Sequence, residues 1–398
     1  MTPKLLADIE KGTKGALTKK KIIQYYLHAR SSTIPDLAKE LELSIPTVAK
    51  FLNDMMKEGV IANYGKLEAG EGRPPALYGL NPQAGYFVGV DIKKFSVDVA
   101  LMDLMGDVVT MKEDIPLLFE NTEAYLDALC QTVREFIDTT QFDHDRLLNI
   151  CVNISGRVNP QKGFSYILFN FDERPLAQVL TEKIGHPACI DNDTRAMAYG
   201  EMMKGVVKDE QDIIFINISW GLGAGLIFNG DVYMGKSGFS GEFGHFNVFD
   251  NEIICHCGKR GCLESLVSLR HVRRLLARAG DTDDLSALSY RELFARSAGG
   301  DDRAQGVVRH LARCFAAALH NLSLTYDQDA VVFQGEFAWA DETFDRCLKE
   351  ELRQFRYYPE GQLFSIAYDR RELPMLAARG GAELIKRQYF AELGGEQG

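Results

Sequence analysis

The first sixty residues contain short amphipathic stretches whose apolar positions follow helical spacing. The stretch from Lys19 to Arg30 predicts a first helix. Thr33 and Asp36 form a cap pair at the start of a second helix, and Ser44 caps a third. The inner stripe of the third helix consists of Val48, Phe51, Leu52 and Met55. Two short helices joined by a three-residue turn predict a helix-turn-helix.

After Gly59 the pattern changes to two short strands with a loop rich in glycine and proline between them. The strands are expected at Val60–Tyr64 and Ala76–Leu80, and the loop over residues 70–75 reads Gly-Glu-Gly-Arg-Pro-Pro. This hairpin is a β-wing with a basic tip. Asn81-Pro82 then interrupts the chain, so we expect a winged helix-turn-helix domain over residues 1–82 and a second domain over residues 83–398.

Beyond residue 82, short strands, often rich in β-branched residues, alternate with longer helical stretches, which predicts an α/β fold. The expected strands are Tyr86–Ile92, Val97–Met102, Leu148–Ile154, Ile213–Ile218, Ala224–Phe228 and Ala330–Phe333.

The third helix of the head has the side chains that a DNA-reading helix needs. Thr47, Lys50 and Asn53 are spaced to share one face, opposite the apolar stripe and close enough to the N-terminus to reach base edges in a major groove. Arg73, between Gly72 and Pro74 in the wing, is placed to enter a minor groove or lie against phosphate. The alternative is a small helical module for protein interaction with an incidental hairpin.

Charge is unevenly distributed along the chain, which carries a formal net charge of −11. Residues 1–80 hold 12 Lys and Arg against 9 Asp and Glu, so this part carries +3 and the remainder −14. A basic head on an acidic body permits binding of double-stranded DNA through the head alone. No apolar run reaches the roughly 20 residues of a membrane helix, and the N-terminus lacks the apolar core of a signal peptide, so we expect a cytoplasmic protein without a membrane partner.

Three of the eight cysteines crowd together at Cys255, Cys257 and Cys262. With a nearby histidine they supply the four ligands of one tetrahedral structural zinc per chain, and Gly258 and Gly261 relax the backbone between them. His245 is the favoured fourth ligand, because a cysteine on each side would strain the ring of His256; His256 stays open as the alternative. Three buried free cysteines without metal are the competing interpretation.

Two neighbouring segments form the most specific motif of the sequence. The first reads Gly241-Glu242-Phe243-Gly244-His245, and the second, from Cys255 to Glu264, reads Cys-x-Cys-Gly-x-x-Gly-Cys-x-Glu. This arrangement resembles the zinc signature of the ROK family, a group of repressors, open reading frames and sugar kinases. The resemblance extends over residues 83–398, and with the head the chain is similar to the NagC/XylR-type repressors of that family. It implies an actin-like, ribonuclease H-like two-lobed sugar-kinase fold behind the winged helix-turn-helix.

The resemblance also implies a sugar site. The family's sugar-binding Asn-Asp pair, whose aspartate is the catalytic base in kinases, matches Asn192-Asp193, and its two glutamates match Glu242 and Glu264. His245 would serve twice, with one ring nitrogen on zinc and the other donating to a sugar hydroxyl. The sugar-binding residues expected in this way are Asn170, Asn192, Asp193, Glu242, His245 and Glu264. For each carboxylate alone, a solvated acidic surface is the simpler interpretation.

The phosphate-binding loops of the family's kinases are altered. The family pattern Asp-x-Gly-Gly-Thr reads Asp91-Ile92-Lys93-Lys94-Phe95 here, so both glycines are replaced, by Lys93 and Lys94. Glycines in such a loop let backbone N–H groups approach phosphate oxygens, and a Cβ would collide. A threonine is replaced by Trp220, and a Gly-Gly pair near adenosine reads Gly335-Glu336. We therefore expect no kinase activity and no catalytic residue, with Asp193 left as a vestigial base.

These observations predict a homodimeric or higher oligomeric repressor that binds operator DNA and responds to a sugar or sugar derivative. The alternative is an active carbohydrate kinase that uses ATP with Asp193 as base and carries an accessory head. The sequence leaves open which sugar binds, which operator is read, and whether the sugar releases or recruits DNA.

Overall fold

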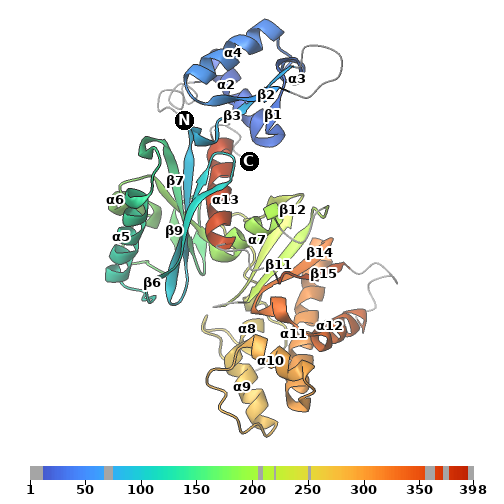
Figure 1. Ribbon diagram of the computed structural model, residues 1–398. Coiled ribbons are helices and arrows are strands. Elements are labelled where there is room, and N and C mark those ends of the chain that lie inside the picture. The colour runs from blue at the N-terminus through green and yellow to red at the C-terminus, as the bar shows by residue number, and fades with distance from the viewer. Residues whose placement is uncertain are drawn as a thin grey trace. The chain divides into compact units, whose positions relative to one another are not determined.

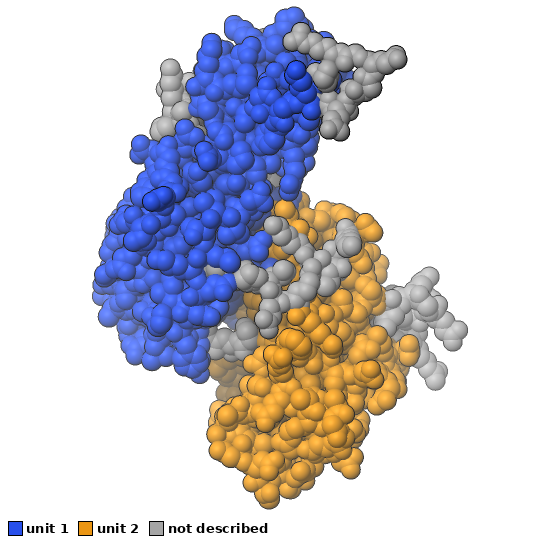
Figure 2. Space-filling view, viewed as in Figure 1, with its two compact units in different colours: residues 1–196, 374–398 blue, residues 197–373 orange. Residues whose placement is uncertain are grey.

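The computed structural model describes residues 12–66, 75–204, 209–218, 221–249, 252–354, 364–370 and 376–392. The chain divides into two compact units, which Figure 2 colours separately. The first comprises residues 1–196 and 374–398, and the second comprises residues 197–373. The predicted domain boundary after residue 82 lies inside the first unit and stays a prediction.

The head of the first unit contains three helices, α2 (Lys14–Ala29), α3 (Ile34–Glu40) and α4 (Ile45–Lys57). Its sheet has the order β1-β3-β2, formed by β1 (Ser31–Ser32), β3 (Ala76–Leu80) and β2 (Ile61–Lys66). The helix-turn-helix and both wing strands are confirmed, whereas Arg73 lies outside the described residues. Helix α2 begins five residues earlier than predicted, because the side chain of Thr13 caps it by accepting from the backbone N–H of Ala16.

The body of the first unit is a five-stranded sheet in the order β10-β7-β4-β5-β6. Its strands are β4 (Tyr86–Ile92), β5 (Ser96–Asp103), β6 (Val108–Pro116), β7 (Leu147–Ile154) and β10 (Ala188–Asn192), and a small hairpin pairs β8 (Val158–Asn159) with β9 (Phe164–Ser165). Helices α5 (Glu123–Thr139) and α6 (Leu176–Ile184) cover one face of the sheet, and α13 (Leu376–Glu392) covers the other (Figure 1).

Helix α13 packs very closely on the first sheet. A Cβ at Gly89 in β4 would lie 1.7 Å from the carbonyl oxygen of Ala378, and one at Gly381 would lie 2.4 Å from Oδ1 of Asn153. Asn153 in turn donates from Nδ2 to the carbonyl oxygen of Ala377 at 2.7 Å. Only glycine fits at Gly89, where two backbones approach this closely, and at Gly381 an added methyl group would displace the amide of Asn153.

The second unit is built on another five-stranded sheet, in the order β13-β12-β11-β14-β15. Its strands are β11 (Ile213–Ile218), β12 (Leu222–Phe228), β13 (Asp231–Val232), β14 (Ala330–Gly335) and β15 (Ser365–Tyr368). The helices are α8 (Leu263–Val267), α9 (Leu269–Arg278), α10 (Tyr290–Ala298), α11 (Asp302–Tyr326) and α12 (Glu342–Gln354), while α7 (Asp193–Lys204) crosses the boundary between the units.

Both large sheets have the same strand arrangement. In each, one strand of an antiparallel trio also pairs in parallel with a fourth strand, which pairs in parallel with a fifth. All six strands predicted for the body are present at the predicted positions to within two residues. The α/β prediction is confirmed, and none of the described helices is both long and apolar enough to cross a membrane.

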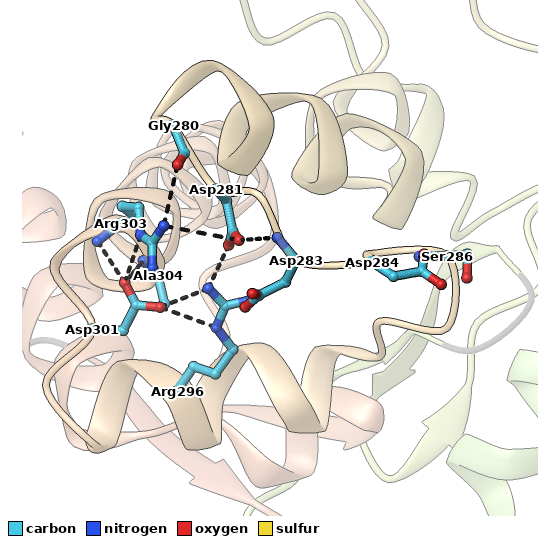
Figure 3. Close-up of polar contacts among 9 residues, drawn as sticks. All are labelled: Gly280, Asp281, Asp283, Asp284, Ser286, Arg296, Asp301, Arg303 and Ala304. Carbon is cyan, nitrogen blue, oxygen red and sulfur yellow. Dashed lines mark hydrogen bonds and ion pairs between the residues drawn. The ribbon is translucent and has the colours of Figure 1, made fainter.

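A charged network connects the ends of three helices in the second unit (Figure 3). The carboxylate of Asp281, after α9, pairs with Arg296 of α10, which also pairs with Asp301 at 2.6 Å, just before α11. Arg303 donates to the carbonyl oxygen of Gly280 at 3.2 Å. The network fixes the position of the end of α9 relative to α10 and α11.

Candidate functional site

Four candidate metal ligands converge in the second unit. The ligand atoms of His245, Cys255, Cys257 and Cys262 all lie within 4.8 Å of one another. The Sγ atoms of Cys257 and Cys262 are 3.6 Å apart, and Nδ1 of His245 is 3.7 Å from Sγ of Cys255. Bridges between Asn247 and Cys262 and between Ile254 and Arg260 fold the segment back on itself.

The two histidines of this region have different surroundings. The ring of His245 directs Nδ1 at the thiols, while its Nε2 lies 3.7 Å from a carboxylate oxygen of Glu242. His256 is largely exposed, and its Nδ1 lies 3.6 Å from Oε1 of Glu264 and 3.7 Å from Sγ of Cys255. A second group of candidate ligands therefore consists of His245, His256 and Glu264. The four-ligand group contains His245, and its role as the fourth zinc ligand stays a prediction.

Burial changes the acid–base behaviour of the thiols. It raises the pKa of Cys262 to about 12 and also raises the pKa of Cys255. Both thiols would stay protonated at neutral pH without a nearby cation, and a bound divalent metal is the usual way to obtain the thiolates. Burial likewise raises the pKa of Glu264.

In the first unit, the Asn192-Asp193 pair lies where β10 ends and α7 begins. One oxygen of Asp193 accepts from the hydroxyl of Ser155, and the other accepts from the N–H of Thr194 at 2.7 Å. Asn192 donates from Nδ2 to the carbonyl oxygen of Gly156 at 3.1 Å. Both side chains are therefore held at the carboxyl ends of the parallel strands β7 and β10, where α/β sheets bind their ligands.

Three residues of this corner were not predicted from the sequence. Ser155 follows directly after β7, and a polar residue at the end of a buried parallel strand was the available signal. Asp191 and Arg195 form a buried ion pair of 2.5 Å that fixes the first turn of α7. No local pattern indicates that pair, because its aspartate lies in a strand and its arginine in the following helix.

In the segment where the family's kinases have two glycines, the side chains contact neighbouring residues of the first unit. Nζ of Lys93 lies 2.6 Å from Asp98 and 3.1 Å from Asp114, so two carboxylates compensate its charge. Burial and the neighbouring carboxylate of Asp193 raise the pKa of Asp91 to about 7. Phe95 is largely exposed, with Nζ of Lys94 placed 4.9 Å from its ring centre.

The carboxylate of Glu336 also has a partner within the protein, because it accepts a hydrogen bond from the backbone N–H of Tyr290 at 2.7 Å. That N–H is one of the free donors in the first turn of α10. Trp220 lies outside the described residues.

The predicted sugar-binding residues fall into two sets. Asn192 and Asp193 belong to the first unit, and Glu242, His245 and Glu264 belong to the second. Asn170 is exposed in the loop between β9 and α6, and no hydrogen bond among the described residues joins it to Asn192 or Asp193. A common site for the two sets stays a prediction.

The expected DNA-reading face of α4 is open to solvent. Lys50 and Asn53 are exposed, and Thr47 is half-buried beside the helix cap, where its Oγ1 lies 2.7 Å from the hydroxyl of Ser44. The opposite face is fully buried through Val48, Leu52 and Met55. DNA contact by this face stays a prediction.

Comparison with known proteins places both parts of the chain. The pattern described as ROK family matches residues 87–388, and the one described as winged helix-turn-helix DNA-binding matches residues 17–62. The chain is 27% identical to the xylose repressor of Bacillus subtilis (strain 168) over 331 residues, which is 83% of this chain and 85% of that protein. It is 25% identical to the DNA-binding transcriptional dual regulator NagC of Escherichia coli (strain K12), with 88% and 87% of the two chains covered.

Among solved structures, a ROK family transcriptional regulator described as a homologue of the E. coli MLC protein is similar with a TM-score of 0.75. The two are 26% identical, and the match covers 91% of this chain and 93% of the other. The two-lobed fold expected from the sequence is thus confirmed for the body, with the winged helix-turn-helix before it.

Proposed function

Because the chain belongs to the ROK family and joins that family's body to an N-terminal winged helix-turn-helix, we propose that it is a carbohydrate-responsive transcriptional repressor. The observation that carries this proposal is the presence of the DNA-binding head and the retained Asn-Asp, Glu and His residues in one chain. Two proteins that are similar to more than four fifths of the chain are named as a xylose repressor and a DNA-binding transcriptional dual regulator.

In this proposal, two heads of a homodimer read the half-sites of a palindromic operator through Thr47, Lys50 and Asn53 of α4. A sugar or sugar derivative binds at Asn192, Asp193, Glu242, His245 and Glu264 and shifts the equilibrium between states that hold DNA with different affinity. A ~100-fold change in DNA affinity requires a difference of about 2.7 kcal/mol between those states, which a few hydroxyl contacts can supply.

We expect the protein to bind DNA without acting as a kinase. The charge of Lys93 is compensated by Asp98 and Asp114, and the carboxylate of Glu336, at the position where the family's kinases have glycine, accepts a hydrogen bond from the first turn of α10. Asp193 then accepts a hydrogen bond from the ligand instead of a proton. ATP turnover with a sugar that Asp193→Asn abolishes would overturn this part of the proposal.

The DNA-binding step is tested by selecting bound fragments from a pool of random duplexes and measuring affinity for the enriched sequence. Replacing a groove-facing side chain removes about 1–3 kcal/mol of specific binding, so Asn53→Ala and Lys50→Ala should each weaken binding roughly fivefold or more. Lys162→Ala, an exposed lysine of the body, is the matched control and should leave affinity unchanged. Equal affinity of all three variants and the wild type would contradict the proposal.

The metal is proposed to be one structural zinc per chain, held by His245, Cys255, Cys257 and Cys262. Tetrahedral zinc with bonds of about 2.0–2.3 Å places its ligand atoms roughly 3.5–3.8 Å apart, and the separations of 3.6 and 3.7 Å fit that geometry. Zinc would supply the positive charge that buried thiolates need and would fix the ring of His245, whose Nε2 then donates toward Glu242 and the ligand.

Elemental analysis of the purified protein should find about one zinc per chain, and Cys257→Ser should lower both the zinc content and the thermal midpoint. Cys314→Ser, a buried cysteine on α11 outside the cluster, is the control and should keep its zinc. Metal-free wild-type protein with an unchanged thermal midpoint would exclude a structural zinc.

A further inference from the structure

A pocket of about 670 Å³ lies in the second unit beside the zinc cluster. Its lining includes Glu264 and His256, and, from the segment that ends α8 and forms α9, Ser268, Arg270, His271 and Arg274. A proposed sugar-contacting carboxylate therefore shares one cavity with a basic helix. The volume lies within the range of pockets that hold small ligands.

Two arginine side chains of this pocket are available to bind a ligand. Arg270 and Arg274 are exposed one helical turn apart on α9, and among the described residues neither has a hydrogen-bond or ion-pair partner. The neighbouring Arg273 donates to the carbonyl oxygen of Leu288 at 3.0 Å. Side chains at i and i+4 lie on the same face of a helix, so the two free guanidinium groups can act on one ligand.

The carboxylates of the pocket do not fully cancel the charge of the two arginines, because only Glu264 is without an arginine or lysine partner among the residues that line it. Glu252, which also lines the pocket, is paired with Arg260. Glu264 lies 3.6 Å from Nδ1 of His256. The side of the pocket formed by α9 therefore carries an uncompensated positive charge.

His271 supplies a second, independent indication of a ligand. Its side chain lines the pocket and is 9% exposed, and its Nδ1 is buried without a hydrogen-bond partner in the described part of the chain. Burial and the nearby positive groups lower the pKa of His271 to about 4, so the ring is neutral at neutral pH. An unpaired buried polar atom costs about 1–3 kcal/mol, so His271 is a polar residue of the pocket wall whose hydrogen-bonding capacity at Nδ1 the described residues leave unused.

We infer that the effector is an anionic carbohydrate, whose hydroxyl groups bind at Glu264 and whose phosphate or carboxylate binds between Arg270 and Arg274. The inference rests on the proposed carbohydrate-sensing function and specifies its ligand class. Guanidinium groups bind phosphate and carboxylate oxygens through paired, charge-assisted hydrogen bonds, and neutral sugars offer no such acceptor. Sugar phosphates and sugar acids share this chemistry.

The test is calorimetric titration of the full-length wild-type protein with matched sets of ligands: neutral monosaccharides, their phosphates, the corresponding uronic acids, and inorganic phosphate. The variant is Arg270→Gln/Arg274→Gln, and the control is Arg278→Gln, an exposed arginine of α9 that does not line the pocket. We expect one phosphorylated or acidic sugar to bind at least about tenfold more tightly than its neutral parent. The double variant should lose that factor while binding the neutral parent within twofold of wild type, and Arg278→Gln should behave as wild type.

The outcomes separate this inference from the proposed function. Binding of neutral sugars with no preference for anionic forms, or an equal effect of the double variant and Arg278→Gln, overturns the anionic ligand and leaves carbohydrate sensing intact. No binding of any carbohydrate, or binding of inorganic phosphate alone, overturns both. Tighter binding of the sugar phosphate than of the uronic acid would identify the anionic group as a phosphate, and the reverse would identify it as a carboxylate.

Discussion

At the scale of single residues, Arg296 connects the carboxylates that lie after α9 and before α11. The carboxylate side chain of Asp281 is fully buried and pairs with Arg296, while Arg303 lies 3.9 Å from it (Figure 3). Removing one partner of a buried pair leaves an uncompensated charge. Arg296→Gln should therefore lower the free energy of unfolding by about 2–3 kcal/mol, measured by thermal or urea unfolding.

Arg291→Gln on the same helix is the control for that variant. The guanidinium of Arg291 stacks on Trp339 at 3.9 Å and is exposed, so its loss should cost less than about 1 kcal/mol. Equal destabilisation by the two substitutions would show that the ion-pair network does not determine the stability of this region.

The same arginine gives a pH dependence through Asp301. Its hydrogen bond from Arg296 is the main reason that the pKa of Asp301 falls from its ordinary 3.8 to about 2. Because the folded pKa lies below the unfolded one, the carboxylate contributes stability above about pH 4 that is lost as the pH falls toward about 2. The difference in thermal midpoint between wild type and Arg296→Gln should shrink between about pH 6 and about pH 3. A difference that stays constant over this range would contradict the assignment.

At the scale of elements, the contact between α13 and β4 depends on the absence of a side chain at Gly89. A Cβ there would meet the carbonyl of Ala378 at 1.7 Å, so α13 would have to move away from the sheet. Gly89→Ala should destabilise the first unit by about 1–3 kcal/mol and speed amide hydrogen exchange over residues 376–392.

Gly306 offers the matched control for this substitution. It lies in α11, and beyond the neighbouring backbone of that helix no atom of the described residues lies within 4 Å of the position that an added methyl group would take. Gly306→Ala should therefore be neutral or stabilise the protein by up to about 1 kcal/mol. Normal exchange in α13 of Gly89→Ala would show that the helix tolerates the methyl group.

The sequence predicted the elements whose pattern is local. Strands such as β4 and β11 consist mainly of apolar residues, and α3 and α4 begin at the capping residues Thr33 and Ser44. The hydrophobic pattern and the caps were therefore sufficient to predict these elements. The strand β6 was not predicted, because most of its residues are exposed and the charged run Lys112–Asp114 interrupts its apolar positions. The position of α13 on the first sheet was also beyond sequence reasoning, since β4 and α13 are separated by most of the chain.

At the scale of the whole molecule, the candidate sites differ in how much of each could be predicted from the sequence. The zinc ligands lie within eighteen residues, and their spacing predicted the set that converges around His245 and Cys255. The basic pocket on α9 was not predicted, because Arg270 and Arg274 form an ordinary charged face until the fold places Glu264 beside them. Ser155 reaches Asp193 through the pairing of distant strands, which no local pattern encodes.

The return of α13 to the first sheet has a consequence for synthesis of the protein. Ile385 and Phe390 of α13 belong to the same apolar cluster as Leu80 of the head and Phe87 of β4. A ribosome makes these two residues after the entire second unit, so the growing chain carries an incomplete first unit until translation of the second unit is finished. A prematurely terminated chain would expose that apolar cluster to chaperones and proteases. The molecules that persist in the cell are therefore expected to be full-length chains, in which the head is always accompanied by the second unit.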